Sequence, residues 1–190
     1  MNRYTIIADI SNHICSLLKK NMTPEPILNE EFIGVCTPNE KGDLILGIYL
    51  YDIKESEEIR STTMVNRNVS RQKFPPTYLT LYFMLTAYSN TEMKFKYIDD
   101  QRIIGRAIQV LSDNSIINIE ELIHSSDILM PEAKIQILNL NLEEKSKIWN
   151  ASNVPYRLSV CFSVSPVELE STRERKVQRV VDVISEVKEK

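Results

Sequence analysis

The feature that most constrains the fold of this chain is a regular alternation of side chains along residues 78–88. Every second position from Leu79 onward is aliphatic or aromatic, whereas the positions between carry tyrosine, threonine and one methionine. Successive side chains point to opposite faces of a β-strand, so this segment would present one apolar face and one amphipathic face. We predict a strand whose apolar face lies in the core and whose other face lies against either a helix or a neighbouring subunit.

Further segments also have strand character. Residues 156–164 follow the helix-breaking Pro155 and alternate, and residues 134–140 alternate in the same way. Residues 44–51 are apolar at nearly every position, which is typical of a central strand that is buried on both faces. A short strand at 32–36 is predicted inside a long connection that contains several prolines.

Apolar residues at helical spacing predict helices at residues 3–20 and 99–114 and a shorter helix at 142–149. Gly105 lies inside the second helix at a cost of about 1 kcal/mol relative to alanine, which is either simply tolerated or offset by close backbone packing. Trp149 is expected to anchor the short helix on the sheet. These elements together predict a single α+β domain in which helices pack on one sheet.

Residues 53–73 are polar and predict a long exposed loop or arm, a type of segment that is usually functional or disordered in a compact domain. Arg67, Arg71 and Lys73 form a local basic cluster there, although the formal net charge of the chain is −3. A solvated surface, a protein contact and, least favoured, a nucleic-acid contact are the possible interpretations of this cluster.

The sequence contains no recognisable catalytic or metal-binding pattern. Its 190 residues, of which 43% are hydrophobic, suffice for one domain that folds without a disulfide or a metal. His13 and His124 fall in different predicted elements, the three cysteines lie far apart, and the four glycines are scattered rather than gathered in a phosphate loop. We expect no cofactor, no metal and no enzymatic activity; a small ligand-binding or enzymatic domain is the least favoured alternative.

Neither export nor membrane insertion is indicated. Asp9 lies where a signal peptide would need an apolar run. The longest apolar stretch, at 44–51, is far shorter than the roughly 20 residues that span a bilayer. We expect a soluble cytoplasmic protein without a membrane partner.

Four segments, taken in order, carry a resemblance to one family. They lie at residues 46–51, 67–88, 103–111 and 142–160 and include the sequences LGIYLY, RNVSRQKFPPTYLTLYFMLTAY, IIGRAIQVL, LEEKSKIW and VPYRLSV. In this order and spacing the chain resembles the tail-cap or tail-terminator proteins of extracellular contractile injection systems. These systems are phage-tail-like particles that include antifeeding prophages and virulence cassettes.

The resemblance implies a division of the chain at about residue 167. Residues 1–167 would form a tail-terminator-like domain, with a mixed, mostly antiparallel sheet flanked by helices as in phage tail terminators. Residues 168–190 would form a charged C-terminal extension, in which residues 177–187 have helical spacing but also β-branched residues that permit a strand.

The resemblance also implies a structural function. The chain would form a homohexameric ring on the distal end of the inner tube, end tube growth and anchor the last sheath layer. Its partners would be further copies of itself, the tube and the sheath, without nucleic acid, and it would pass from the cytoplasm into the assembled particle. A tube or sheath adaptor of the same particle is the alternative.

Within the family segments we single out two sets of residues. Arg67, Arg71 and Lys73 are expected to contact the tube or the sheath. The positions expected to maintain the structure are Pro75, Pro76, Gly105, Trp149, Pro155, Tyr156 and Arg157.

Overall fold

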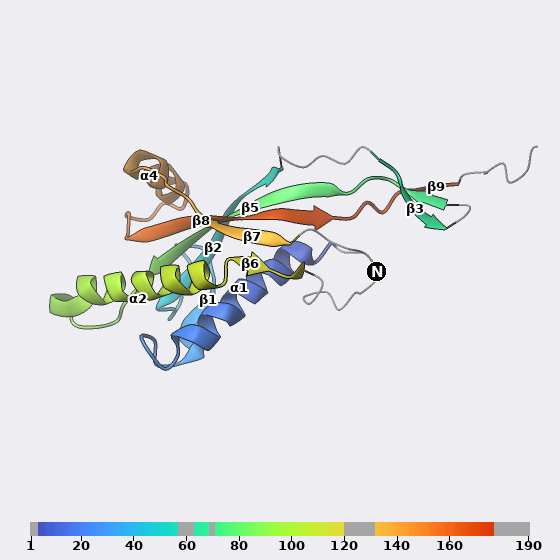
Figure 1. Cartoon of the computed structure of the whole chain (residues 1–190). Coiled ribbons are helices and arrows are strands. Elements are labelled where there is room, and N and C mark those ends of the chain that lie inside the picture. The colour runs from blue at the N-terminus through green and yellow to red at the C-terminus, as the bar shows by residue number, and fades with distance from the viewer. Residues whose placement is uncertain (1–3, 57–62, 69–70, 120–131, 177–190) are drawn as a thin grey trace, which may run out of the picture.

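The computed structural model describes residues 4–56, 63–68, 71–119 and 132–176. Its centre is a six-stranded sheet with the strand order β1-β2-β5-β8-β7-β6 (Figure 1). These strands are β1 Ile33–Val35, β2 Leu46–Glu55, β5 Thr77–Ala87, β8 Ser159–Leu169, β7 Ala133–Ile137 and β6 Ile116–Ile117. A separate three-stranded sheet has the order β3-β4-β9 and consists of β3 Val65–Asn68, β4 Arg71–Lys73 and β9 Glu174–Lys176.

The pairing of the main sheet confirms a mixed, mostly antiparallel architecture. β5 pairs antiparallel with β2 on one side and with β8 on the other, and β7 pairs antiparallel with β8 and β6. Only the β1–β2 pairing of this sheet is parallel. The alternating segment at 78–88 therefore lies at the centre of the sheet, and the apolar segment at 44–51 contributes an inner strand.

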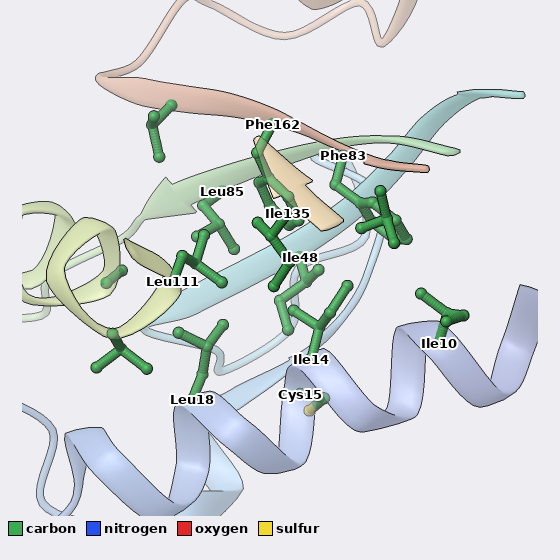
Figure 2. Close-up of a cluster of buried hydrophobic side chains, with 14 of the residues drawn as sticks. Ile10, Ile14, Cys15, Leu18, Ile48, Phe83, Leu85, Leu111, Ile135 and Phe162 are labelled. Carbon is green, nitrogen blue, oxygen red and sulfur yellow. The ribbon is translucent and has the colours of Figure 1, made fainter. Parts of the chain in front are cut away.

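Helices α1 (Ile6–Met22) and α2 (Met93–Asp113) cover one face of this sheet. Figure 2 shows Ile14 and Leu18 of α1 pointing toward Ile48 and Leu85 of the sheet. Each such large aliphatic side chain contributes about 1.5–3 kcal/mol when fully buried. Phe83 and its cross-strand partner Phe162 stack within the same cluster, with ring centroids 5.2 Å apart. The predicted apolar face of the central strand therefore lies in the hydrophobic core.

Helix α4 (Leu142–Ala151) covers part of the opposite face. Trp149, 1% exposed, packs there with Met84 of β5 and Cys161 of β8, and its indole Nε1–H donates to Ser159 Oγ at 3.2 Å. Of the two neighbours predicted for the amphipathic face of β5, a helix or another subunit, the helix is therefore correct at this end of the strand. Further along β5, Thr80 Oγ1 donates to Ser165 Oγ at 3.0 Å, and this part of the face stays polar.

A capping box explains where α4 begins. The side chain of Asn141 accepts a hydrogen bond from the backbone N–H of Glu144, and the Glu144 carboxylate accepts one from the N–H of Asn141. This reciprocal pair satisfies two of the backbone donors that a helix start leaves unpaired. The 3₁₀ helix η1 (Glu30–Phe32) leads into β1.

Several predicted boundaries are wrong, and β8, for example, spans Ser159–Leu169 rather than 156–164. Helix α2 begins at Met93 rather than at Asp99. Its first turns were not predicted, because their apolar side chains are exposed and do not fit the buried stripe of the helix. Residues 53–73 are not one long loop, because β2 continues to Glu55 and both β3 and β4 are strands. The prediction for residues 177–187 lies outside the described residues.

The exposed position of Gly105 on α2 generates the first prediction. A Cβ added there would meet no atom within 4 Å, so the glycine is tolerated rather than required for packing. Gly105→Ala should raise the free energy of unfolding by about 0.5–1 kcal/mol, because alanine lowers the entropy of the unfolded chain.

Gly47→Ala is the matched control for that variant. A Cβ at Gly47 would lie 2.8 Å from Cys36 Sγ and 3.1 Å from the Tyr88 ring, so this variant should lose about 1–3 kcal/mol. Urea unfolding followed by circular dichroism measures both. A loss of stability in Gly105→Ala would show that this face of α2 is packed.

The second prediction concerns the packing of α4 on the sheet. Trp149→Ala should lower the free energy of unfolding by about 3–5 kcal/mol, because it opens a cavity above Met84 and Cys161. Trp149→Phe should lose roughly 1–3 kcal/mol, since it retains an aromatic ring but not the indole N–H. Tyr156→Ala, which removes a half-exposed ring, should lose less than about 1 kcal/mol. Equal losses in Trp149→Ala and Tyr156→Ala would contradict this assignment.

Candidate functional site

The three-stranded sheet, here called the arm, extends the two central strands of the main sheet. β4 runs into β5 through residues 74–76, and β8 runs into β9 through residues 170–173. The two links are joined, because Phe74 N donates to Arg173 O at 3.0 Å and the Arg173 guanidinium lies 4.2 Å from the centroid of the Phe74 ring. Figure 1 shows the arm projecting beyond the ends of β5 and β8.

Ion pairs between β4 and the segment that contains β9 hold the arm. Arg71 Nη1 lies 3.3 Å from Glu174 Oε2, and Lys73 forms an ion pair with Glu170 that is more sheltered from solvent. The backbone register places Arg71 opposite Lys176. The described side chains of the arm are not part of either buried hydrophobic cluster. The arm is therefore stabilised by backbone hydrogen bonds and charges rather than by an apolar core.

The predicted basic cluster thus lies on adjacent strands instead of on a loop. Arg67 is in β3, and Arg71 and Lys73 are in β4 with carboxylate partners. Strands β3, β4 and β9 still carry one acidic residue, Glu174, against a basic set that comprises Arg67, Arg71, Lys73, Arg175 and Lys176. Pro75 and Pro76 lie in the link to β5, where their fixed φ angles restrict the direction of the chain.

A groove lies at the other end of β5. It has a volume of about 590 Å³ and is bordered by residues 93–101 of α2 and by residues 154–158, with Tyr88 between them. β5 spans 11 residues, so the groove and the arm are separated by a strand of roughly 36 Å. Two different surfaces therefore occupy the two ends of the central strand.

Cations and aromatic rings meet in the groove. Lys41 Nζ lies 5.2 Å and the Arg157 guanidinium 5.4 Å from the centroid of the Tyr88 ring, which are cation–π distances. Burial, with a smaller contribution from Cys36, raises the pKa of Tyr88 to about 12, so its hydroxyl is neutral at physiological pH. The exposed aromatic ring of Tyr97 and the side chain of Lys96 also line the groove.

The structure gathers some of the residues singled out from the sequence. Trp149, Pro155, Tyr156 and Arg157 all line the groove, and the rings of Trp149 and Tyr156 meet edge to face at 6.1 Å. Pro75 and Pro76 lie at the arm, and Gly105 is far along α2. Sequence reasoning missed the residues that complete the groove from the loop before β2, from the end of β5 and from α2, namely Lys41, Tyr88, Met93, Lys96 and Tyr97.

A larger hollow of about 920 Å³ lies on another side of α2, between the helix and the turn after α1. The charged residues that α2 contributes to this hollow are engaged within the chain. Arg102 Nη1 lies 3.1 Å from Asp99 Oδ1, and Arg106 Nη2 donates to Asn21 O at 3.0 Å. This hollow therefore offers few unsatisfied polar groups to a ligand.

The described residues show no arrangement for metal or nucleophilic chemistry. No group of three or more His, Cys, Asp or Glu residues among them could hold a metal ion. Burial raises the pKa of Cys161 to about 11 and also raises the pKa of Cys15 and of Cys36, so these thiols are protonated at neutral pH. His124 lies outside the described residues. Within the described part of the chain, no helix is both long and apolar enough to cross a membrane.

Two solved structures with a similar fold are a sheath/tube terminator and a tube-terminating cap. The chain is similar to the PVC sheath/tube terminator of an extracellular contractile injection system in the extended state, with a TM-score of 0.68 and 17% identity. It is also similar to the tube-terminating cap of the anti-feeding prophage, with a TM-score of 0.65 and 18% identity. These matches cover 97% and 95% of this chain but only 64% and 61% of the two solved chains.

The chain belongs to the family of the Pvc16 N-terminal domain, whose family model matches residues 9–182. No curated protein matches the sequence. The family match runs through β9, so it includes the described strands of both the main sheet and the arm.

The ion pairs of the arm generate the third prediction. Lys73→Glu places two carboxylates together at Glu170, and the amides of β4 and β9 should exchange hydrogen about fivefold faster, as expected when roughly 1 kcal/mol of local stability is lost. The double variant Lys73→Glu/Glu170→Lys restores opposite charges and should return the exchange rates to those of the original chain. Equal exchange in all three proteins would show that the pair does not hold the arm.

Proposed function

We propose that this chain is the structural cap of a contractile injection system. It forms a homohexameric ring on the distal end of the inner tube, ends tube growth and anchors the last sheath layer. The observation that carries this proposal is the fold, which matches a sheath/tube terminator and a tube-terminating cap over nearly the whole chain. The ring assembles in the cytoplasm and then becomes part of the particle, and no catalytic step or cofactor takes part.

The geometry supports such a role in two ways. A ring protomer needs a body that does not deform, and the six-stranded sheet packed on α1 and α2 supplies one. A closed ring also needs contacts between two different surfaces of each copy, in addition to any contact with the tube. The arm and the groove lie at opposite ends of β5, so one of them can meet the tube or the sheath while the other meets a neighbouring copy.

The basic arm is the surface we assign to the tube or the sheath, through Arg67, Arg71 and Lys73. Although Arg71 and Lys73 have intrachain partners, β3, β4 and β9 together remain basic in a chain whose net charge is −3. An arm of this charge would be attracted to an acidic surface of a partner.

Labelling of intact particles tests the function. Gold-tagged chain should give one label at the end of the particle distal to the baseplate, whereas a tube or sheath adaptor would give labels along the shaft. Label at neither place would overturn both the cap and the adaptor.

Cosedimentation with tubes tests the assignment of the arm and is the fourth prediction. The triple variant Arg67→Glu/Arg71→Glu/Lys73→Glu should lose at least about tenfold in tube binding, because it reverses the charge of the arm. The control is Arg71→Glu/Lys73→Glu/Glu170→Lys/Glu174→Lys, which swaps the partners and keeps both the ion pairs and the net charge.

The two variants separate the possible causes. Binding by the swap variant but not by the triple variant means that binding needs the net charge and the ion pairs of the arm rather than those individual side chains. Loss in both, with unchanged circular dichroism melts, means that individual side chains are recognised. Normal binding by the triple variant removes the assignment.

A further inference from the structure

We propose that the groove of one copy binds residues 28–31 of a neighbouring copy, and that this contact joins the protomers head to tail. Residues 28–31, here called the acidic turn, have the sequence LNEE and follow α1. This inference rests on the proposed ring and names the two surfaces that would build it.

The groove is basic, and its cations have no carboxylate partner among the described residues. Lys41, Lys96 and Arg157 line it, and no ion pair joins them to a carboxylate of the described residues. Asp100 is the one acidic residue of the lining, and its Oδ1 already accepts the backbone N–H of Ser89 at 2.8 Å. The groove therefore carries an excess of positive charge that a partner's carboxylates would neutralise.

The groove also has room for an apolar side chain. Met93 is 83% exposed and Tyr97 is 73% exposed, and both line the groove beside Tyr156 and Leu158. Exposed apolar side chains that gather at one place on a surface mark sites of protein contact. The preferred ligand is thus a segment that combines carboxylates with an aliphatic side chain.

The acidic turn of the same chain has this composition. Leu28 is 73% exposed, and Glu30 and Glu31 beside it are exposed as well. Residues 23–40 contain no lysine or arginine, so no basic side chain of this segment competes for these carboxylates. The turn and the groove are therefore complementary both in charge and in apolar character.

The turn and the groove of one copy face different sides of α2. Lys96, Tyr97 and Asp100 line the groove, whereas Asp99, Arg102 and Arg106 line the hollow that Glu25 and Pro26 border just before the acidic turn. None of residues 28–31 lines the groove of its own copy. A contact between two such different surfaces is heterologous, and repetition of a heterologous contact generates a ring when the rotation closes.

Cross-linking between two distinguishable copies tests the contact directly. One copy carries Leu28→Cys and a size tag, the other carries Met93→Cys, and both carry Cys36→Ser to remove a half-buried native thiol. A short bismaleimide linker at high protein concentration should give the mixed dimer. The matched control replaces Met93→Cys by Ile116→Cys, which is also exposed but lies outside the groove. A yield no higher with Met93→Cys than with Ile116→Cys would overturn the proposal.

A charge swap between the copies keeps the test independent of folding defects. Lys96→Glu in the Met93→Cys copy should lower the cross-linking rate about tenfold, and Glu30→Lys/Glu31→Lys in the Leu28→Cys copy should do the same. Mixing the two reversed copies should restore the rate to within about threefold of the original pair. Absence of restoration would contradict the assigned pairing of charges.

The experiment also separates this contact from the cap function. Cross-linking without label at the particle end would retain the contact but remove the cap. Label at the end without cross-linking would retain the cap and overturn the contact. Unchanged cross-linking in the reversed copies, together with weaker cosedimentation with tubes, would assign the groove to the tube and would also overturn the proposal.

Discussion

The antiparallel pairing of β5 with β8 is the interaction on which the rest of the structure depends. It runs from Thr77 opposite Leu169 to Thr86 opposite Ser159 and includes the stacked rings of Phe83 and Phe162. One face of this pair supports α1 and α2, and the other face supports α4. At one end the same two strands lead into the arm, and at the other end β5 leads into Tyr88 and the groove. A defect in this pairing would therefore displace both candidate surfaces.

The same pairing explains which parts of the fold were predictable from the sequence. Residues 78–88 and 156–164 pack a hydrophobic core on one face, and such packing imposes an alternation that is visible in the sequence. The described side chains of the arm join neither buried cluster, and apart from Val65 its strands carry polar residues without alternation. Its pairing joins Lys73 to Glu174, which are distant in the chain, and no local pattern reports such a contact. The early start of α2 was missed because its first turns face outward.

The candidate site was predictable only in part for a related reason. Trp149, Pro155, Tyr156 and Arg157 lie within one short stretch of sequence, and the family resemblance singled them out together as positions expected to maintain the structure. Lys41, Tyr88 and Lys96 come from three other segments and meet only because the sheet and α2 bring them to one place. Lysines and a tyrosine are common surface residues, so each is uninformative until its neighbours are known. The groove is a property of the tertiary structure.

The two surfaces differ in a way that suits different tasks. The arm consists of backbone ladders and ion pairs, so its order depends on ionic strength and on what it contacts. The groove is built on Trp149 and the buried Tyr88, so its shape is fixed by the core and changes little when a partner binds. A preformed groove is suited to a repeated contact between identical copies, whereas an adaptable arm is suited to a neighbour of another kind. Their separation along β5 would let one protomer engage the two proposed partners at the same time.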